Sequence, residues 1–185
     1  MTFECKNCPV EVQQEHCVSQ GRFCFTPPSA ERRQRYSNIT DKQMLEENLR
    51  ERCIYEILAE EKDESDDHLF FNYLFNVHLG CLQMDQAITT KCAERRMENL
   101  KIDVERVNYC IEESFEKFGD RDTTNELLRL DRYNAASLGV SMSPSLAING
   151  HMFHGPLEPQ DIFTQLCHSY KLEHRPKVCA PNFDI

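Results

Sequence analysis

Apolar side chains recur every three to four residues through the middle of this chain, which is the spacing of amphipathic helices that bury one face. Five such helices are predicted: one over 41–61, one from 69 to about 80, one that carries Ile88 and Cys92 on one face, one with apolar residues from 104 to 118, and one over 124–138. Asp41 and Asp103 are placed to cap the first and the fourth helix, and Gly139 is placed to end the fifth. The middle of the chain is therefore expected to be largely helical.

The pattern changes after residue 139. Residues 145–148 have the pattern of a short strand, Asn149-Gly150 is a strong signal for a two-residue hairpin turn, and 151–154 can return antiparallel. A last helix is expected to begin near Pro159, because proline suits the first turn of a helix. This mixture of strands and helices predicts an α/β chain.

The N-terminal segment 1–28 is dense in cysteine and has no helical period. It ends in Thr26-Pro27-Pro28-Ser29, which is a turn or linker signal. We expect a small cross-linked lobe there, joined to the first long helix by an exposed polar connection.

Cysteine usage indicates an oxidising compartment. Ten cysteines in 185 residues exceed what a cytosolic protein usually carries, and their even number favours complete pairing. The chain is therefore expected in the lumen of the secretory pathway or outside the cell. All ten are predicted to form disulfides: Cys5, Cys8, Cys17, Cys24, Cys53, Cys81, Cys92, Cys110, Cys167 and Cys179.

The sequence leaves most of the connectivity open, since ten cysteines allow roughly a thousand pairings. Cys17 with Cys24 would close a tight loop around Gly21, and Cys167 with Cys179 would fix the last helix to the tail. The four cysteines of the helical region are expected to pair among themselves.

Charge and hydropathy exclude several classes of partner. A net charge of −10 argues against nucleic acid, which is bound through clustered Lys and Arg. The longest apolar run is far short of the roughly 20 residues of a membrane helix, so no membrane span is expected in this chain. Residues 1–5 lack the pattern of a signal peptide, so we expect a fragment of a longer precursor. The sequon Asn38-Ile39-Thr40 makes Asn38 a candidate glycosylation site.

The segment 138–150, followed by a second strand and a helix, resembles the second half of a thioredoxin fold. Pro144 matches the cis-proline of that fold, which exposes backbone groups that can pair with a bound peptide. The resemblance implies a binding edge at Ser143, Pro144, Ser145 and Leu146.

A closer resemblance is to the cysteine-rich central region of plant vacuolar sorting receptors. Cys17-Val18-Ser19-Gln20-Gly21-Arg22-Phe23-Cys24 is similar to that family's Cys-x-x-x-Gly-Arg-Tyr-Cys step, and Asn48-Leu49-Arg50-Glu51-Arg52-Cys53 to its Asn-Leu-Arg-x-x-Cys. The later cysteines fall in the same order. An aromatic Trp-Trp-Asp-Tyr step of the family is Leu69-Phe70-Phe71-Asn72-Tyr73 here. Lysosomal thiol reductases and DsbA-type proteins are more distantly similar.

Together these resemblances imply an α/β fold with a thioredoxin-like core, an all-helical insertion and many disulfides. The expected division is a Cys-rich lobe over 1–28 that includes the first strand of the core, a helical insertion over 41–122, and the second half of the core with a Cys-linked tail over 123–185.

Cys5-Lys6-Asn7-Cys8 is the candidate for catalysis, because a CxxC followed by a helix and a cis-proline is the order found in thiol oxidoreductases. In such an enzyme Cys5 attacks, Cys8 resolves and Pro144 lies beside them. The structural alternative is that Cys5 and Cys8 each pair with other cysteines. A zinc cage of Cys5, Cys8, Cys17 and Cys24 is the third alternative.

The hypothesis we favour is a non-catalytic recognition or assembly domain that binds a peptide or protein at the edge near Pro144. Two alternatives stay open. One is a thiol-disulfide oxidoreductase that uses Cys5 and Cys8, and the other is a self-associating structural subunit of an extracellular polymer. We expect neither a cofactor nor a metal.

Overall fold

The structure is a computed structural model that describes residues 2–25, 38–61, 68–141 and 144–182. The chain divides into two compact units, Thr2–Arg132 and a C-terminal unit that begins at Tyr133. Within these ranges each unit contains one small sheet, with three strands in the first and two in the second.

The first unit opens with a three-stranded antiparallel sheet in the order β1-β3-β2. Its strands are β1 (Thr2–Phe3), β2 (Cys17–Val18) and β3 (Phe23–Phe25), and the helix α1 (Val10–His16) lies between β1 and β2 in the chain. A tight turn joins β2 to β3, in which Ser19, Gln20 and Gly21 all have left-handed φ angles, of 55°, 51° and 79°. Two of these residues are not glycine, so the turn carries backbone strain.

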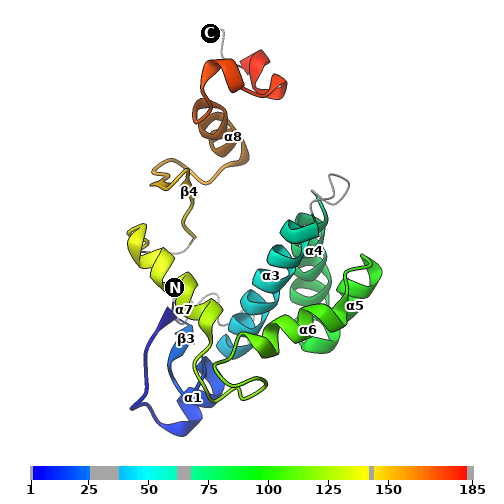
Figure 1. The fold of residues 1–185 in the computed structure, drawn as a ribbon, viewed down its shortest axis with the longest axis vertical. Coiled ribbons are helices and arrows are strands. Elements are labelled where there is room, and N and C mark those ends of the chain that lie inside the picture. Colours follow the sequence, from blue (N-terminus) through cyan, green and yellow to red (C-terminus); the bar gives the residue numbers. More distant parts are fainter. Residues whose placement is uncertain (1, 26–37, 62–67, 142–143, 183–185) are drawn as a thin grey trace. The chain divides into compact units, whose positions relative to one another are not determined.

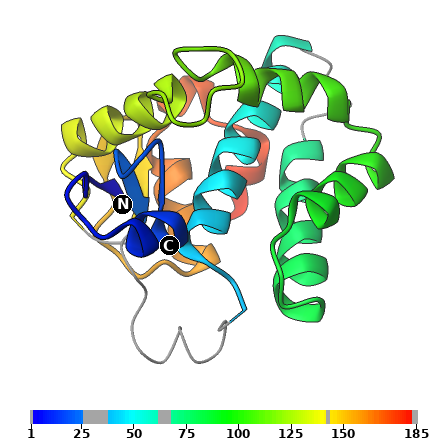
Figure 2. The same cartoon turned by 90° about the horizontal axis from the view of Figure 1, so that it is seen from below.

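The other described elements of this unit are helices. They are α3 (Asp41–Glu61), α4 (Leu69–Asn76), the π-helix η2 (Val77–Met84), α5 (Thr90–Asn99), α6 (Val104–Glu113) and α7 (Glu126–Ser137), whose last turns belong to the second unit. The long helix α3 packs against α4 and α6 on one side and against β2 and β3 on another (Figures 1 and 2). The side chains of Ile54, Tyr73, Met97 and Val107 are fully buried in this core.

The bounds of α3 confirm the helix predicted over 41–61, but the predicted cap is wrong. The Gln43 amide donates to Thr40 Oγ1 at 3.2 Å, and the Thr40 amide donates to Gln43 Oε1 at 2.8 Å. These reciprocal bonds form a capping box, so Thr40 caps the helix. Asp41 is nearly buried and accepts a bond from His16, with 2.6 Å between its Oδ2 and His16 Nδ1.

The second predicted helix continues beyond Gly80 as a π-helix that ends at Met84. A side chain at position 80 would overlap the guanidinium of Arg96, so glycine allows this close approach. The third prediction was displaced, because Ile88 precedes the helix and Thr89 caps it by accepting from the Cys92 amide. The first difference involves a tertiary contact and the second a local cap, and the apolar period records neither.

Asp103 caps α6 through its side chain, as predicted, but the helix ends at Glu113, earlier than expected. The next helix, α7, begins beside the end of α6. Asn125, which immediately precedes α7, is fully buried at this junction. Asn125 donates to Ser114 Oγ at 2.7 Å and accepts from the Leu128 amide at 3.0 Å. This side chain therefore fastens the start of α7 to the end of α6.

The second unit contains the strands β4 (Ala147–Ile148) and β5 (His151–Met152), then α8 (Pro159–His168) and two 3-10 helices, η3 (Leu172–His174) and η4 (Lys177–Asn182). Gly139, with φ at 72°, follows the end of α7, and Pro159 opens α8 after the N-cap Glu158. Both positions agree with the sequence predictions.

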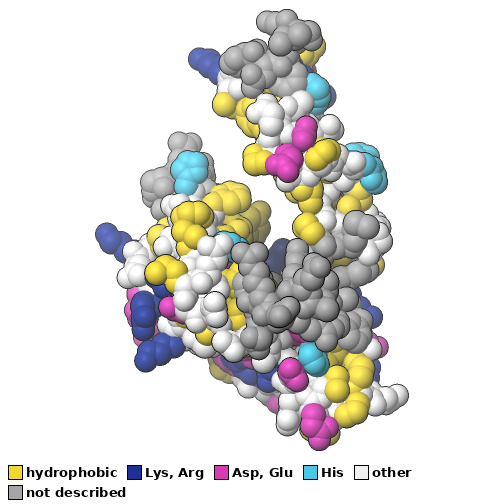
Figure 3. All heavy atoms as spheres, turned by 180° about the vertical axis from the view of Figure 1, so that it is seen from behind, with side chains coloured by type: hydrophobic (Ala, Val, Ile, Leu, Met, Phe, Trp, Pro, Cys, Tyr) yellow, Lys and Arg dark blue, Asp and Glu magenta, His cyan; other side chains and the backbone are white. Residues whose placement is uncertain are grey.

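Apolar side chains gather on the exposed face of α4 (Figure 3). Phe71 and Phe75 are 64% and 62% exposed, and Tyr55 of α3 makes an edge-to-face contact with Phe70 at 5.5 Å between ring centroids.

Across the described ranges, no helix is both long and apolar enough to cross a bilayer.

Candidate functional site

The predicted hairpin is present in the second unit. Ala147 faces Met152 and Ile148 faces His151, with Asn149 and Gly150 in the turn at φ angles of 51° and 80°. Two positive φ angles define a type I′ turn. The Phe153 amide donates to the Leu146 carbonyl at 2.8 Å, which makes that pair hydrogen-bonded and the neighbouring Ala147 pair non-hydrogen-bonded. The N–H and C=O of Ala147 therefore point away from β5, toward the edge of the hairpin.

The residues before this strand include the predicted binding positions. Pro144 and Ser145 are exposed, Leu146 is half-buried, and the backbone at Pro144 forms a bend. Ser143, and with it the predicted cis bond to Pro144, lies outside the described residues. The described part of the predicted edge before β4 is thus accessible at Pro144 and Ser145.

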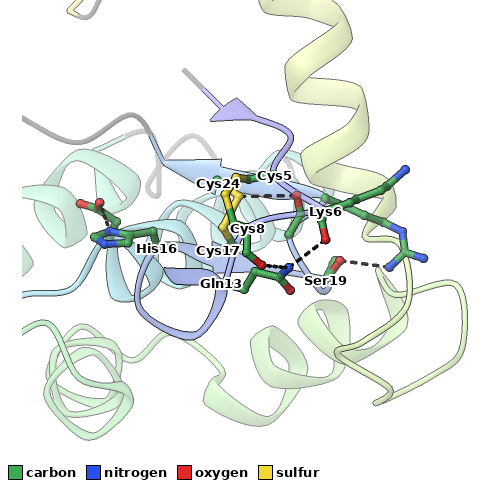
Figure 4. Close-up of a disulfide and its surroundings, with 11 residues drawn as sticks. Cys5, Lys6, Cys8, Gln13, His16, Cys17, Ser19 and Cys24 are labelled. Carbon is green, nitrogen blue, oxygen red and sulfur yellow. Dashed lines mark hydrogen bonds and ion pairs between the residues drawn. A yellow bond between two sulfur atoms is a disulfide. The ribbon is translucent and has the colours of Figure 1, made fainter. Parts of the chain in front are cut away.

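The CxxC segment forms a short disulfide-closed loop in the first unit (Figure 4). The Cys5 amide donates to the Gly21 carbonyl at 2.7 Å, and Gln13 Nε2 donates to the carbonyls of Lys6 and Cys8, both at 3.0 Å. A Cβ at position 21 would lie 2.6 Å from the Cys5 carbonyl oxygen, so only glycine permits this approach. The loop is held by α1 on one side and by the β2–β3 turn on the other.

The pairing of Cys5 with Cys8 corrects the alternative that each joins a different cysteine. Cys17 and Cys24 stand directly opposite each other on β2 and β3 and bridge across the ladder, so neither is available to the CxxC loop. The zinc cage is also wrong, because a zinc ligand must be a thiolate and all four sulfurs are in disulfides.

The other disulfides have the pairings that the sequence indicated. Cys53 of α3 joins Cys110 of α6, and Cys81 of η2 joins Cys92 of α5, so the four helical cysteines pair among themselves. Cys167 of α8 joins Cys179, which fixes η4 to that helix.

A buried charged group lies in the middle of α3. The side chains of Glu47 and Arg50 form an ion pair and are 3% and 5% exposed. The Tyr73 hydroxyl donates to Glu47 Oε1 at 2.6 Å, and Arg50 Nη2 reaches Thr90 Oγ1 at 3.5 Å. Burial, then the charge of Glu47, raise the pKa of Tyr73, so its hydroxyl stays a donor. This group connects α3, α4 and α5, and the sequence pattern did not reveal it.

Comparison with known proteins gives a family. The model of the vacuolar sorting receptor thioredoxin-like domain matches residues 1–167. The chain belongs to this family. Vacuolar-sorting receptor 5 of Arabidopsis thaliana is 29% identical over 175 residues, which cover 91% of this chain and 26% of that protein. Vacuolar-sorting receptor 1 of Pisum sativum is 24% identical over 170 residues, which cover 90% of this chain and 26% of that protein.

The chain thus spans about a quarter of the length of these vacuolar sorting receptors. Membership in their thioredoxin-like domain family confirms the resemblance found in the sequence. Five disulfides fit the oxidising lumen of the secretory pathway.

The two sequence motifs that resemble those of vacuolar sorting receptors, over 17–24 and 48–53, have structural roles here. The Cys17 to Cys24 step forms the β2–β3 ladder and its strained turn, with Gly21 against the CxxC loop. The Asn48 to Cys53 step is the part of α3 that buries Arg50 and carries the disulfide to α6. Both steps therefore join elements together within the first unit.

The pKa of Glu51 predicts a pH dependence of stability. Burial, then the charge of Glu47, raise the pKa of this half-buried side chain from 4.5 to about 7. The folded state then binds a proton more tightly than the unfolded chain, so this stability is present below about pH 4.5 and is lost as pH rises through 7. In the wild type we expect the free energy of unfolding to fall by about 1–3 kcal/mol between these pH values. In Glu51→Gln this fall should be absent.

Urea unfolding followed by circular dichroism at several pH values measures this fall. Glu105→Gln, at an exposed position of α6, is the matched control and should keep the pH dependence of the wild type. An unchanged slope in Glu51→Gln would contradict the assignment.

Proposed function

We propose that this chain is the recognition domain of a sorting receptor in the secretory pathway, and that it binds an extended segment of a cargo protein along the edge of β4. Family membership supports the receptor role, since the relatives are named as vacuolar-sorting receptors. The observation that carries the binding site is the outward-facing backbone of Ala147 beside the exposed Pro144. An extended peptide can add to such an edge through main-chain hydrogen bonds.

The proposed organisation is the one that the sequence resemblance implies. A Cys-rich lobe over 1–28 supplies the first strand of a thioredoxin-like core, and 123–185 supplies its second half and tail. The helices between 41 and 122 are the insertion, cross-linked by their own two disulfides. Asn38 is exposed and is the proposed glycan acceptor.

Proline at position 147 tests the binding edge. It removes the outward N–H of Ala147 and leaves the bonds between β4 and β5 intact, because that N–H is not part of the ladder. We expect peptides selected on the wild type from a random display library to bind Ala147→Pro about tenfold more weakly by fluorescence anisotropy.

Met152→Pro is the matched control, because it removes the outward N–H on the opposite edge of the same hairpin. It should change peptide affinity less than about twofold. Equal losses in both variants, or failure of the wild type to select any peptide, would overturn the proposed site.

A thiol-disulfide oxidoreductase is the second candidate, favoured by the pairing of Cys5 with Cys8 in a partly exposed loop. Such an enzyme reduces insulin in the presence of dithiothreitol, with Cys5 as the attacking thiol. Activity of the wild type that Cys5→Ser abolishes would establish it, and no rate above dithiothreitol alone would exclude it. Self-association, which a polymer subunit requires, stays a prediction.

A further inference from the structure

The first unit contains a cavity of about 640 Å³ that the peptide edge does not use. Its wall is formed by α1, β2 with its strained turn, α3 and parts of the segment 108–128. The apolar part of this wall includes Leu45, Leu49, Phe115 and Leu128, all of them buried. A volume of this size lies within the range of small-ligand sites, and polar side chains line the rest of the wall.

The charge of this cavity is opposite to that of the chain. Its lining has two acidic side chains, Glu46 and Asp122, although the whole protein carries −10. Five cationic side chains line it: Lys6, Arg22, Lys42, Arg50 and Arg121. A concave, partly apolar wall strengthens the field of such a cluster, so the cavity favours an anion.

Three of these cations already have carboxylate partners. Lys6 pairs with Glu4 at 2.8 Å, Arg121 pairs with Glu112 at 2.6 Å, and Arg50 pairs with the buried Glu47. Their charges are largely compensated within the protein.

Arg22 and Lys42 differ, because neither has a carboxylate oxygen within 4.0 Å among residues 2–25, 38–61, 68–141 and 144–182. Arg22 Nη1 instead donates to the carbonyls of Ser19 at 3.0 Å and Asp122 at 2.9 Å. Neutral acceptors hold this guanidinium in place without a carboxylate in direct contact with it. The lining thus has a fixed cation, Arg22, and a second cation, Lys42, without a carboxylate contact.

The wall also contains two buried polar atoms without a hydrogen-bond partner among the described residues. They are the Ser19 hydroxyl and Arg50 Nε. Ser19 and Gln20 keep left-handed φ angles, which cost a non-glycine residue about 1–2 kcal/mol each. Strain and unpaired donors are retained in the same wall, as is common at ligand sites.

We propose that this cavity binds a carboxylate carried on an apolar group. Arg22 and Lys42 bind the carboxylate through charge-assisted hydrogen bonds, and the apolar group lies against Leu45, Phe115 and Leu128. The source is a free organic acid or the last residue of a peptide, which offer the same chemistry.

Isothermal titration with N-acetyl-phenylalanine tests the site, and N-acetyl-phenylalaninamide, which lacks the charge, is the matched ligand. We expect saturable binding of the acid and at least about tenfold weaker binding of the amide. Lys42→Gln should weaken binding of the acid about fivefold and Arg22→Gln about tenfold or more.

Lys91→Gln is the control variant, because Lys91 is exposed, does not line the cavity and is the second residue of α5 as Lys42 is of α3. It should leave the affinity within about twofold. Lys42 is only partly buried and is not part of the hydrophobic core, so Lys42→Gln keeps the test valid even if Arg22→Gln fails to fold. Tighter binding of Ala-Ala-Phe than of the acetylated acid identifies a peptide terminus as the source, and weaker binding identifies a free acid.

Three results would overturn the proposal: no saturable binding up to about 10 mM acid, equal affinity for acid and amide, or equal losses in Lys42→Gln and Lys91→Gln. The proposed peptide edge is tested separately, because Ala147 belongs to the second unit and these variants to the first.

Discussion

Replacing Cys53 and Cys110 together by alanine is expected to lower the free energy of unfolding by about 4 kcal/mol. This disulfide joins α3 to α6 across 57 residues, the longest loop that any disulfide of the chain closes. In the chain-entropy model a longer loop restrains the unfolded chain more, so its loss costs more stability. Cys53 is also fully buried, so the change leaves unfilled space in the core.

The matched comparison is the double alanine variant of Cys81 and Cys92, whose disulfide closes only 11 residues. Its expected loss is about 3 kcal/mol. Urea unfolding without reductant, followed by circular dichroism, measures both. A smaller loss for the Cys53 and Cys110 variant than for this one would contradict the argument from loop length.

Arg50→Met is expected to destabilise the first unit by about 3–5 kcal/mol. The change leaves the carboxylate of Glu47 buried, with the Tyr73 hydroxyl as its remaining partner from the group described above. A buried charge without its counter-charge is far more costly than a buried neutral amide. Urea unfolding near pH 7 measures the loss.

The control is the double variant Glu47→Gln with Arg50→Met. Glutamine can still accept from Tyr73 and carries no charge, so we expect the double variant to be more stable than Arg50→Met alone. If the two single losses simply add in the double variant, the unpaired carboxylate is not the cause.

Local patterns predicted the elements whose shape is decided locally. The apolar period of 41–61 matched α3 to the residue, since one long helix buries a continuous stripe against its neighbours. Asn149-Gly150 predicted the hairpin because only the turn residues must accept positive φ angles. Asp103 was found for a similar reason, as its side chain bonds to an amide three residues away.

Features made by distant segments could not be predicted in this way. The hydrogen bond from the Cys5 amide to the Gly21 carbonyl, which holds the CxxC loop against the β2–β3 turn, joins residues that are far apart in the chain. The cavity depends on Arg22 reaching the carbonyl of Asp122, 100 residues along the chain. The part of this cavity that the sequence did indicate is the turn at Gly21, because a glycine between two cysteines suggested the tight turn that forms part of the wall.

The covalent map of the disulfides has a consequence for how the polypeptide responds to proteases. Every bridge closes within 5–110 or within 167–179, so no sulfur bond spans the stretch between Cys110 and Cys167. A single backbone cut in that stretch releases two fragments on a non-reducing denaturing gel, whereas a cut between Cys53 and Cys81 leaves one band until thiol is added. Each fragment keeps an even number of cysteines, so after reduction each can re-form its own disulfides within the same fragment.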